Sequence, residues 1–265
     1  MILYHTVSPL SIAFSNFFEI FSDYFARNLL DLILPIYYNE RKQTGGFSMN
    51  IAFLGDSITL GYGLEDSDDR FSAVLCRRLA AAEINCGITG TLVARAGLSR
   101  DNGTSYIDRI AGIGGADCLV VFGGTNDYFW SDTPIDGDTP AHFRHAVREL
   151  IEACRVLFHG DFRRVLFLTP YSHHGIGNFS GGSAWNASSE HDTTSVNWVG
   201  HVMADYADAI VTECEAAQVP CLNLHALPFG WRSLTADGCH PNPDGHRWLC
   251  DRILETGFFD GIGKE

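Results

Sequence analysis

Residues 51–61 read IAFLGDSITLG, an apolar run that passes into a glycine-bearing turn with Ser57 at its centre. The uninterrupted apolar residues predict a strand that is buried on both faces, as in a parallel sheet covered by helices. Gly55 permits the tight turn that must follow. The stretch therefore predicts the first strand of an α/β sheet, with Ser57 at its carboxyl end, where ligands reach such sheets.

The chain after this stretch alternates between short apolar runs and longer helical patterns, which is typical of a parallel sheet wrapped by helices. We expect strands at residues 50–54, 84–88, 118–122, 165–169 and 219–224. We expect helices at residues 69–82, 106–110, 141–158, 194–217 and 243–256, most of them with apolar residues three or four positions apart. Two long connections, 128–139 and 171–193, are predicted to be loops that line a pocket.

The composition limits the partners that the chain can have. Eighteen basic and 32 acidic residues give a formal charge of −14, which disfavours nucleic acids and anionic membrane surfaces. The eight cysteines contain no CxxC pair and several lie in strand-like runs, so we expect buried thiols and a reducing, cytoplasmic compartment. We expect a small-molecule or oligosaccharide ester as the partner; no pattern in the sequence sets the oligomeric state.

Residues 1–48 differ from the rest of the chain. They are rich in aromatic and aliphatic residues, but they lack the early basic residues of a signal peptide. Charged residues also interrupt the apolar run at intervals of about one turn, which argues against a helix that crosses a membrane. We therefore divide the chain into an extension, residues 1–48, and a domain, residues 49–265. The extension is either an amphipathic segment or sequence upstream of a natural start at Met49.

A second polar motif, DGCHP at residues 237–241, lies far along the chain from Ser57. A serine hydroxyl attacks an ester only when a base removes its proton, and the imidazole of His240 is suited to that task. Asp237, three residues earlier, could orient the ring and stabilise its charged form. Ser57, His240 and Asp237 are therefore candidates for a nucleophile, a base and an orienting carboxylate.

Two further strand ends supply hydrogen-bond donors for an oxyanion. The second strand runs into GITGT at residues 87–91, and the third runs into GGTND at residues 123–127. The backbone N–H of Gly90 and the side chain of Asn126 carry no net charge and suit this role. Gly97 competes with Gly90, but Gly90 follows its strand directly and is preferred. Asp127 is expected to support the Asn126 loop by local hydrogen bonding.

These four blocks, in this order, resemble those of the SGNH or GDSL hydrolase superfamily, which is named after a Ser, a Gly, an Asn and a His. The resemblance covers residue 49 to the C-terminus, with Ile58 where the short motif often has Leu. It implies a flavodoxin-like three-layer α/β/α sandwich with a five-stranded parallel sheet. It further implies a Ser57–His240–Asp237 triad and an oxyanion hole formed by Ser57 N–H, Gly90 N–H and Asn126.

The sequence predicts the class of reaction more narrowly than it predicts the substrate. A short acyl group, including acetyl on a sugar, fits the acidic composition and the aromatic residues of the two long connections. The predicted substrate contacts are Asp56, Tyr128, Trp130 and Trp185. A lysophospholipase or thioesterase, and a carbohydrate-binding protein without catalysis on the same fold, stay open as alternatives.

The residues near the last motif do not predict a metal site. His246 and Asp244 lie close to it in sequence, but their spacing matches no familiar ligand pattern. Asn242 followed by Pro243 is instead typical of a helix start. The glycines after the first strand match neither a dinucleotide fingerprint nor a phosphate-binding loop. We therefore expect the protein to use no metal and no other cofactor.

Overall fold

The computed structural model of the chain describes residues 49–95, 104–130, 134–172, 196–197 and 199–262. The expectations for residues 1–48 concern a segment outside these ranges. The described residues form a sheet whose strands all run parallel. Its strands are β1 (Asn50–Gly55), β2 (Ala82–Gly87), β3 (Cys118–Phe122), β4 (Val165–Leu168) and β5 (Cys221–Leu222).

The strands lie in the order β2-β1-β3-β4-β5. Gly55 at the end of β1 pairs with Gly87 of β2 on one side and with Phe122 of β3 on the other. This is the flavodoxin-like order, in which the chain turns to opposite sides of the sheet after β1 and after β3, and a crevice forms between their carboxyl ends. The predicted five-stranded parallel sheet is confirmed.

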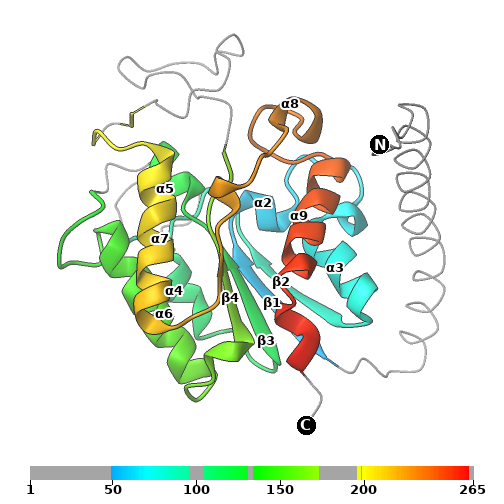
Figure 1. Ribbon diagram of the computed structural model, residues 1–265, viewed down its shortest axis with the longest axis horizontal. Coiled ribbons are helices and arrows are strands. Elements are labelled where there is room, and N and C mark those ends of the chain that lie inside the picture. Colours follow the sequence, from blue (N-terminus) through cyan, green and yellow to red (C-terminus); the bar gives the residue numbers. More distant parts are fainter. Residues whose placement is uncertain (1–48, 96–103, 131–133, 173–195, 198, 263–265) are drawn as a thin grey trace, which may run out of the picture. The chain divides into compact units, whose positions relative to one another are not determined.

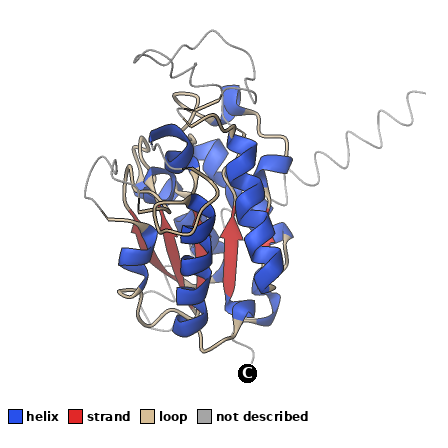
Figure 2. Ribbon diagram, turned by 90° about the vertical axis from the view of Figure 1, so that its left-hand side faces the viewer, coloured by secondary structure: helices blue, strands red, loops and turns tan. Residues whose placement is uncertain are grey.

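Helices cover both faces of the sheet, which gives three layers (Figures 1 and 2). One face carries α4, α6 and α7, with α6 against α7, and the other carries α3 and α9, which pack on each other. The helices are α2 (Ser57–Leu60), α3 (Phe71–Leu79), α4 (Tyr106–Ile110), α5 (Thr125–Trp130), α6 (Phe143–Leu157), α7 (Met203–Ala217), α8 (Trp231–Leu234) and α9 (Pro243–Glu255). Short 3-10 turns are η1 (Ser67–Asp69), η2 (Phe162–Arg164), η3 (Leu224–Ala226) and η4 (Phe258–Gly261).

The hydrophobic core has two parts, one on each face of the sheet. Along β1, Ala52 and Leu54 point to the face covered by α6 and α7, while Ile51 and Phe53 point to the face covered by α3 and α9. All four side chains are buried completely. Burial on both faces explains why the strand reads as a continuous apolar run with no polar alternation.

Sequence signals at the helix ends account for several boundaries. Asn242 caps α9 by accepting a hydrogen bond from Gly245 N–H at 3.0 Å, and Pro243 occupies the first turn, as predicted. The predicted helix 194–217 begins only at Met203, because the chain first makes a turn at Gly200, whose φ is +86°. The helix α6 agrees with its prediction to within two residues at each end.

Two predictions about the strands and connections were wrong in detail. The last strand was expected to start at Val219, but β5 starts at Cys221, since Pro220 has no N–H to give to the ladder. Tyr128 was expected to open a loop, but residues 125–130 form the helix α5 directly after the turn at Gly124. Tyr128 and Phe129 therefore belong to a helix, and both are buried.

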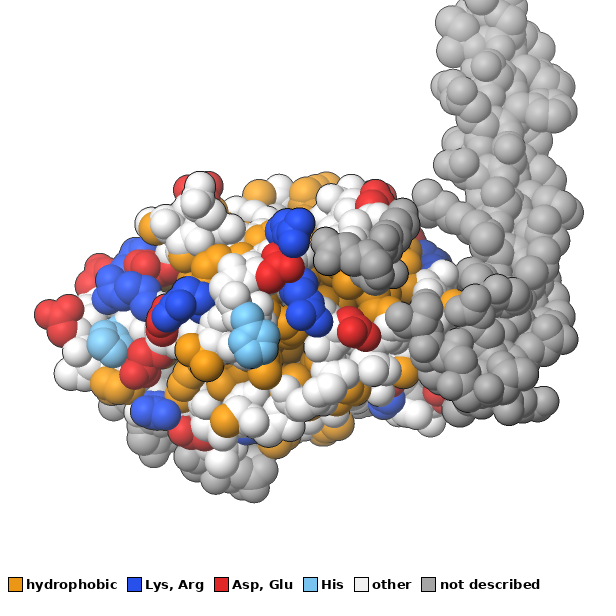
Figure 3. Space-filling model, turned by 90° about the horizontal axis from the view of Figure 1, so that it is seen from below, with side chains coloured by type: hydrophobic (Ala, Val, Ile, Leu, Met, Phe, Trp, Pro, Cys, Tyr) orange, Lys and Arg blue, Asp and Glu red, His pale blue; other side chains and the backbone are white. Residues whose placement is uncertain are grey.

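None of the helices in the described ranges is long and apolar enough to cross a bilayer. On the face of the molecule seen in Figure 3, Lys and Arg side chains lie next to Asp and Glu side chains, with hydrophobic side chains between them. This face therefore carries both positively and negatively charged side chains, although the net charge of the chain is negative.

Candidate active site

Ser57 opens the short helix α2 immediately beyond β1. Asp56 caps this helix by accepting a hydrogen bond from Ile58 N–H at 2.9 Å. Gly55 is required at the turn, because a Cβ there would lie 1.9 Å from the hydroxyl oxygen of Thr59. The strand, the glycine and the cap together fix Ser57 at the carboxyl edge of the sheet.

The His240 ring lies between Ser57 and Asp237. Its Nε2 is 3.1 Å from Ser57 Oγ, and its Nδ1 is 2.7 Å from Asp237 Oδ2. The other oxygen of Asp237 accepts hydrogen bonds from the backbone N–H groups of His240 and Cys239, at 2.7 and 3.0 Å. The carboxylate thus holds both the ring and the backbone of the loop that carries it. The structure brings these three residues together as predicted.

Electrostatics keep Asp237 ionised. Burial opposes its negative charge, but the hydrogen bonds from the His240 ring and from the backbone N–H groups of His240 and Cys239 outweigh burial and lower the pKa of Asp237 to about 2. The ionised Asp237 accepts a hydrogen bond from Nδ1–H of the neutral ring. Nε2 then carries the lone pair and can accept the hydroxyl proton of Ser57.

Asn126 lies in the first turn of α5, next to the serine. Its Nδ2 donates to the carbonyl oxygen of Thr91 at 3.1 Å and to Asp56 Oδ2 at 3.3 Å. Thr91 follows Gly90, whose φ of +73° puts it in the left-handed region that glycine favours. The Asn126 amide therefore joins the turn that carries Gly90 to the residue before Ser57. The predicted donors from two strand ends lie on one edge of the sheet.

The sequence profile of the GDSL-like Lipase/Acylhydrolase family matches residues 53–248. The chain belongs to this family. The match spans all four of the blocks that carried the resemblance, so that resemblance is confirmed. This GDSL-like hydrolase has no match among curated proteins.

Solved structures share the fold of this GDSL-like hydrolase. A protein from Lactobacillus plantarum is 25% identical with a TM-score of 0.63, over 80% of this chain and 96% of that chain. An acetyl xylan esterase is 18% identical with a TM-score of 0.52, over 78% and 99% of the two chains. An alpha/beta hydrolase enzyme from the metagenome of Lake Arreo is 19% identical with a TM-score of 0.51, over 80% and 99%. The last two likenesses concern the fold.

Tyr171, which the sequence analysis did not single out, holds the loop of His240 in this GDSL-like hydrolase. It lies shortly after β4, and its hydroxyl donates to the carbonyl oxygen of Cys239 at 2.5 Å. Its ring packs on Phe229 with centroids 4.2 Å apart. The N–H of Ala236 also donates to the carbonyl oxygen of His240 at 3.0 Å. Hydrogen bonds from Tyr171 and Ala236 therefore fix the backbone of the His240 loop, and the ring of Tyr171 anchors it to the core.

Arg109 was also missed, and it ties three segments of the site together. From α4 its guanidinium donates to the carbonyl oxygens of Cys86 and Gly55, at 2.5 and 3.1 Å, and to Thr91 Oγ1 at 3.0 Å. The same group lies over the ring of Tyr106, 4.9 Å from its centroid. It therefore joins the ends of β1 and β2 to the turn that carries Gly90. An isolated arginine in a helical pattern gives no signal of such a role.

Two buried carboxyls flank the site. Burial raises the pKa of Asp127 to about 7, although its oxygens accept hydrogen bonds from Ala94 N–H and Val93 N–H, both at 2.9 Å. Burial raises the pKa of Asp56 to about 6, against the hydrogen bond from Ile58 N–H and the positive charges of His240 and Arg109. Asp127 was expected to act locally, but these bonds reach a segment distant in sequence, the one that follows Thr91.

The predicted substrate contacts of Asp56 and Tyr128 need correction. The Asp56 carboxyl is buried and bonded to Ile58 N–H and Asn126, so it supports the turn of Ser57 instead of facing an open surface. The Tyr128 ring is 4% exposed and packs in the core against Phe129. The ring also meets that of Tyr206 edge to face, with centroids 6.0 Å apart. Three further predictions lie outside the described parts of the structure: Gly97, the side chain of Trp130, and Trp185.

Tyr62 is a further aromatic residue that the sequence analysis did not single out. It follows α2 between Gly61 and Gly63, and its ring centroid lies 4.7 Å from that of His240. The residue is 52% exposed, so it is accessible to solvent beside the imidazole. A tyrosine between two glycines just past the serine motif is a signal that could have drawn attention to it.

His246 has a structural role in this GDSL-like hydrolase. Its side chain is completely buried, and Nδ1 accepts a hydrogen bond from Phe71 N–H, the first amide of α3, at 3.1 Å. Burial lowers the pKa of His246 to about 3, and the positive charges of His240 and Arg70 act in the same direction. Across the described ranges, no group of three or more His, Cys, Asp or Glu side chains is arranged to hold a metal ion.

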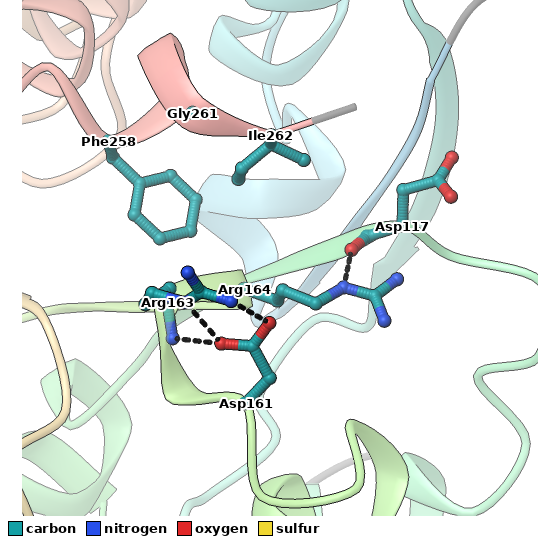
Figure 4. Close-up of a pocket in the computed structure, with 7 residues that line it drawn as sticks. All are labelled: Asp117, Asp161, Arg163, Arg164, Phe258, Gly261 and Ile262. Carbon is teal, nitrogen blue, oxygen red and sulfur yellow. Dashed lines mark hydrogen bonds and ion pairs between the residues drawn. The ribbon is translucent and has the colours of Figure 1, made fainter. Parts of the chain in front are cut away.

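A cavity of about 320 Å³ lies at the opposite end of the sheet (Figure 4). Asp117 and Arg164 come directly before β3 and β4, so this cavity is at the amino ends of the strands. Arg163 pairs with Asp161 at 2.8 Å, and Arg164 donates to the carbonyl oxygen of Asp117 at 2.5 Å. The cavity is separate from Ser57. It is lined by Asp117, Asp161, Arg163, Arg164, Phe258, Gly261 and Ile262.

Proposed function

We propose that this GDSL-like hydrolase is a serine ester hydrolase that cleaves short-chain acyl esters, acetylated carbohydrates among them, through an acyl-Ser57 intermediate. The hydrogen-bonded chain from Ser57 Oγ through the His240 ring to Asp237 carries this proposal. Its distances of 3.1 and 2.7 Å are those at which a base takes the proton of a nucleophile and a carboxylate orients that base.

In the acylation step, Ser57 Oγ attacks the carbonyl carbon of the ester while His240 Nε2 takes the hydroxyl proton. The imidazolium that forms is stabilised by the ionised Asp237, which already accepts a hydrogen bond from Nδ1–H. The carbonyl oxygen becomes negative as the tetrahedral intermediate forms. When that intermediate collapses, His240 gives its proton to the oxygen of the departing alcohol, and the acyl group stays on Ser57.

The oxyanion would be stabilised by the Asn126 side chain together with Ser57 N–H and Gly90 N–H. Asn126 Nδ2 is already oriented by its bond to the Thr91 carbonyl, and its contact with Asp56 is the longer one, at 3.3 Å. The oxyanion would replace this longer contact. Donors that are fixed before the reaction stabilise developing charge without reorganisation, which is why they contribute strongly.

Deacylation uses the same residues with water in place of the alcohol. His240 takes a proton from a water molecule that attacks the acyl carbon, and the ring then returns that proton to Ser57 Oγ as the carboxylic acid leaves. Both steps need a nucleophile, a base that transfers its proton, and hydrogen-bond donors that stabilise the oxyanion. The residues described around Ser57 therefore account for both half-reactions.

The side chains next to Ser57 on the Asn126 side favour a short acyl group. Asp56, Thr91 and Asn126 are all buried and polar there. A long acyl chain would need an apolar surface to leave water. Among the residues that the structure describes, the exposed apolar side chains close to Ser57 are Leu60 and Tyr62, which belong to the helix α2 and the turn after it. We therefore favour acetyl or a similarly short group over a fatty acyl chain.

The eight cysteines support a cytoplasmic location. All of them are free thiols, and six are buried. Free cysteines in this number are typical of a reducing compartment. Fractionation of the producing cells, followed by detection of the protein in the cytoplasmic fraction, tests this part of the proposal.

A chain-length series of p-nitrophenyl esters, from acetate to palmitate, tests the proposed function with the wild-type protein and the Ser57→Ala variant. We expect the highest kcat/KM with acetate, loss of turnover in the variant, and release of acetate from acetylated xylo-oligosaccharides. A preference for palmitate would favour a lipid-like substrate. Binding of oligosaccharides without hydrolysis of any ester would favour a carbohydrate-binding protein.

A further inference from the structure

Tyr62 is fixed relative to the nucleophile by the backbone. Its N–H donates to the carbonyl oxygen of Ser57 at 2.9 Å, and the N–H of Gly61 donates to the same oxygen at 3.0 Å. Gly61 and Gly63 both have φ of +85°, a conformation that favours glycine. The chain therefore makes a tight turn whose apex presents Tyr62. The backbone of Tyr62 is therefore held at a constant distance from that of Ser57.

The position of Tyr62 indicates which half of an ester it would meet. In the proposed reaction, His240 Nε2 gives its proton to the oxygen of the leaving alcohol, so the alcohol must lie against the imidazole. The oxyanion would instead be bound by the Asn126 amide, a different group from the imidazole. Tyr62 packs on the His240 ring, with centroids 4.7 Å apart and ring planes at 48°. It therefore borders the alcohol half of the substrate.

The exposure of Tyr62 argues against a purely supporting role. His240 is already held by Asp237 through its ring and its backbone N–H, and by Ala236 through its carbonyl oxygen. The Tyr62 side chain is 52% exposed, and within the described residues its hydroxyl has no hydrogen-bond partner. A residue kept only to support the imidazole would bury more of its ring. An open aromatic face beside a reacting group is instead suited to contact with a ligand.

A ring-shaped alcohol fits this face best. A pyranose presents a flat array of C–H groups that can cover an aromatic face and remove apolar area from water, while its hydroxyl groups stay hydrated. A small alkyl alcohol such as ethanol covers little of the ring. The contact therefore distinguishes the two kinds of alcohol by the area that each one buries.

We propose that Tyr62 is a specificity-determining residue whose exposed ring stacks on the sugar ring that carries the scissile ester. This inference rests on the proposed function and names the alcohol half of its substrate. Stacking lowers the free energy of the transition state for a sugar ester and leaves that of a simple alkyl ester unchanged.

The test compares kcat/KM for acetylated methyl xylopyranoside and for ethyl acetate in the wild-type protein, Tyr62→Ala and Tyr62→Phe. We expect Tyr62→Ala to lose about tenfold or more on the sugar ester and less than about twofold on ethyl acetate. Tyr62→Phe, which keeps the ring, retains most of the sugar preference. Val156→Ala removes an exposed apolar side chain of α6 and serves as the control, with both activities unchanged.

The outcomes separate this inference from the function on which it rests. An equal loss of kcat/KM on both esters in Tyr62→Ala would mean that the ring supports His240. No loss on either ester would mean that the substrate does not touch the ring. Both results overturn the inference and leave the proposed ester hydrolase function intact. Wild-type protein that hydrolyses neither ester overturns the proposed function, and the inference with it. Thermal unfolding of each variant shows whether the fold is retained.

Discussion

The hydroxyl of Tyr171 donates a 2.5 Å hydrogen bond to the carbonyl oxygen of Cys239, the residue before His240. The Tyr171→Phe variant keeps the ring but leaves this carbonyl without its donor. We expect the free energy of unfolding to fall by about 1–2 kcal/mol. We also expect kcat to fall by about tenfold with little change in KM, because His240 is positioned less well in the transition state.

A matched control for Tyr171→Phe is Tyr206→Phe. Tyr206 is also buried, and its hydroxyl accepts a hydrogen bond from Asn197 at 2.9 Å. It belongs to α7 and to the core on the face of the sheet opposite to that of Tyr171. This variant should lose stability and keep kcat. Equal losses of kcat in both variants would show that Tyr171 acts only through general stability.

Asp237→Asn should lower kcat by about 10³-fold to 10⁴-fold, since an amide cannot hold the ring in the required tautomer or stabilise its charge. The hydrogen bonds that lower the pKa of Asp237 to about 2 keep it ionised at neutral and mildly acidic pH. The loss should therefore be seen at every pH from about 5 to 9. Steady-state kinetics across this range check it, and a loss confined to acidic pH would contradict the role given to Asp237.

Asn126→Ala should lower kcat by about 10²-fold to 10³-fold while KM changes little, because an oxyanion donor acts mainly in the transition state. The substitution also removes the bonds to Thr91 and Asp56, so stability must be measured alongside. Kinetics at a temperature well below the measured Tm separate the two effects. A variant that folds and retains wild-type kcat would exclude Asn126 from the oxyanion hole.

His246 should make the fold sensitive to acid. Its pKa is lowered to about 3 by burial, whereas in the unfolded chain it takes the usual value of about 6.5. Between these values the unfolded state binds the extra proton, so stability falls as the pH drops below about 6.5. We expect this group to cost on the order of 2 kcal/mol between pH 7 and about pH 4.5. Urea unfolding of wild-type protein and His246→Gln at both pH values measures the difference.

The comparison with His246→Gln is needed because two carboxyls act in the opposite direction. Burial raises the pKa of Asp56 to about 6 and that of Asp127 to about 7, so the folded state takes up protons on acidification and is stabilised by them. These contributions are the same in both proteins and cancel in the difference. If His246→Gln loses as much stability as the wild type between the two pH values, His246 is not the acid-sensitive group.

The sheet could be predicted because each central strand is buried on both faces. Residues 51–54 and 118–122 are apolar without a break, and the turns after them contain the glycines that parallel strands need there. The fifth strand was predicted too long, because its apolar residues continue past the two positions that pair with β4. An apolar pattern indicates which residues are buried. Val219 and Leu224 are buried, but only Cys221 and Leu222 pair with β4.

The site could be predicted where a residue has chemistry of its own. Ser57 stands out by its position directly after a strand, and Asp237 and His240 stand out by type in one short polar motif. The structure joins the three by hydrogen bonds. Tyr171 and Arg109 act by supporting backbone carbonyls that are distant in sequence, and no local pattern reveals such partners. Tyr128 was misassigned because an aromatic residue in a helix can face the core as well as a pocket.

The most direct test of the central claim is covalent labelling of the nucleophile with diethyl p-nitrophenyl phosphate. An activated serine oxygen displaces p-nitrophenolate from phosphorus and keeps the diethylphosphoryl group. Peptide mapping by mass spectrometry should find one such group per chain, on the peptide that contains Ser57, with activity lost in proportion to labelling. A fully labelled Ser57 in a protein that still hydrolyses p-nitrophenyl acetate, or a label on another residue that accompanies the loss of activity, would contradict the account.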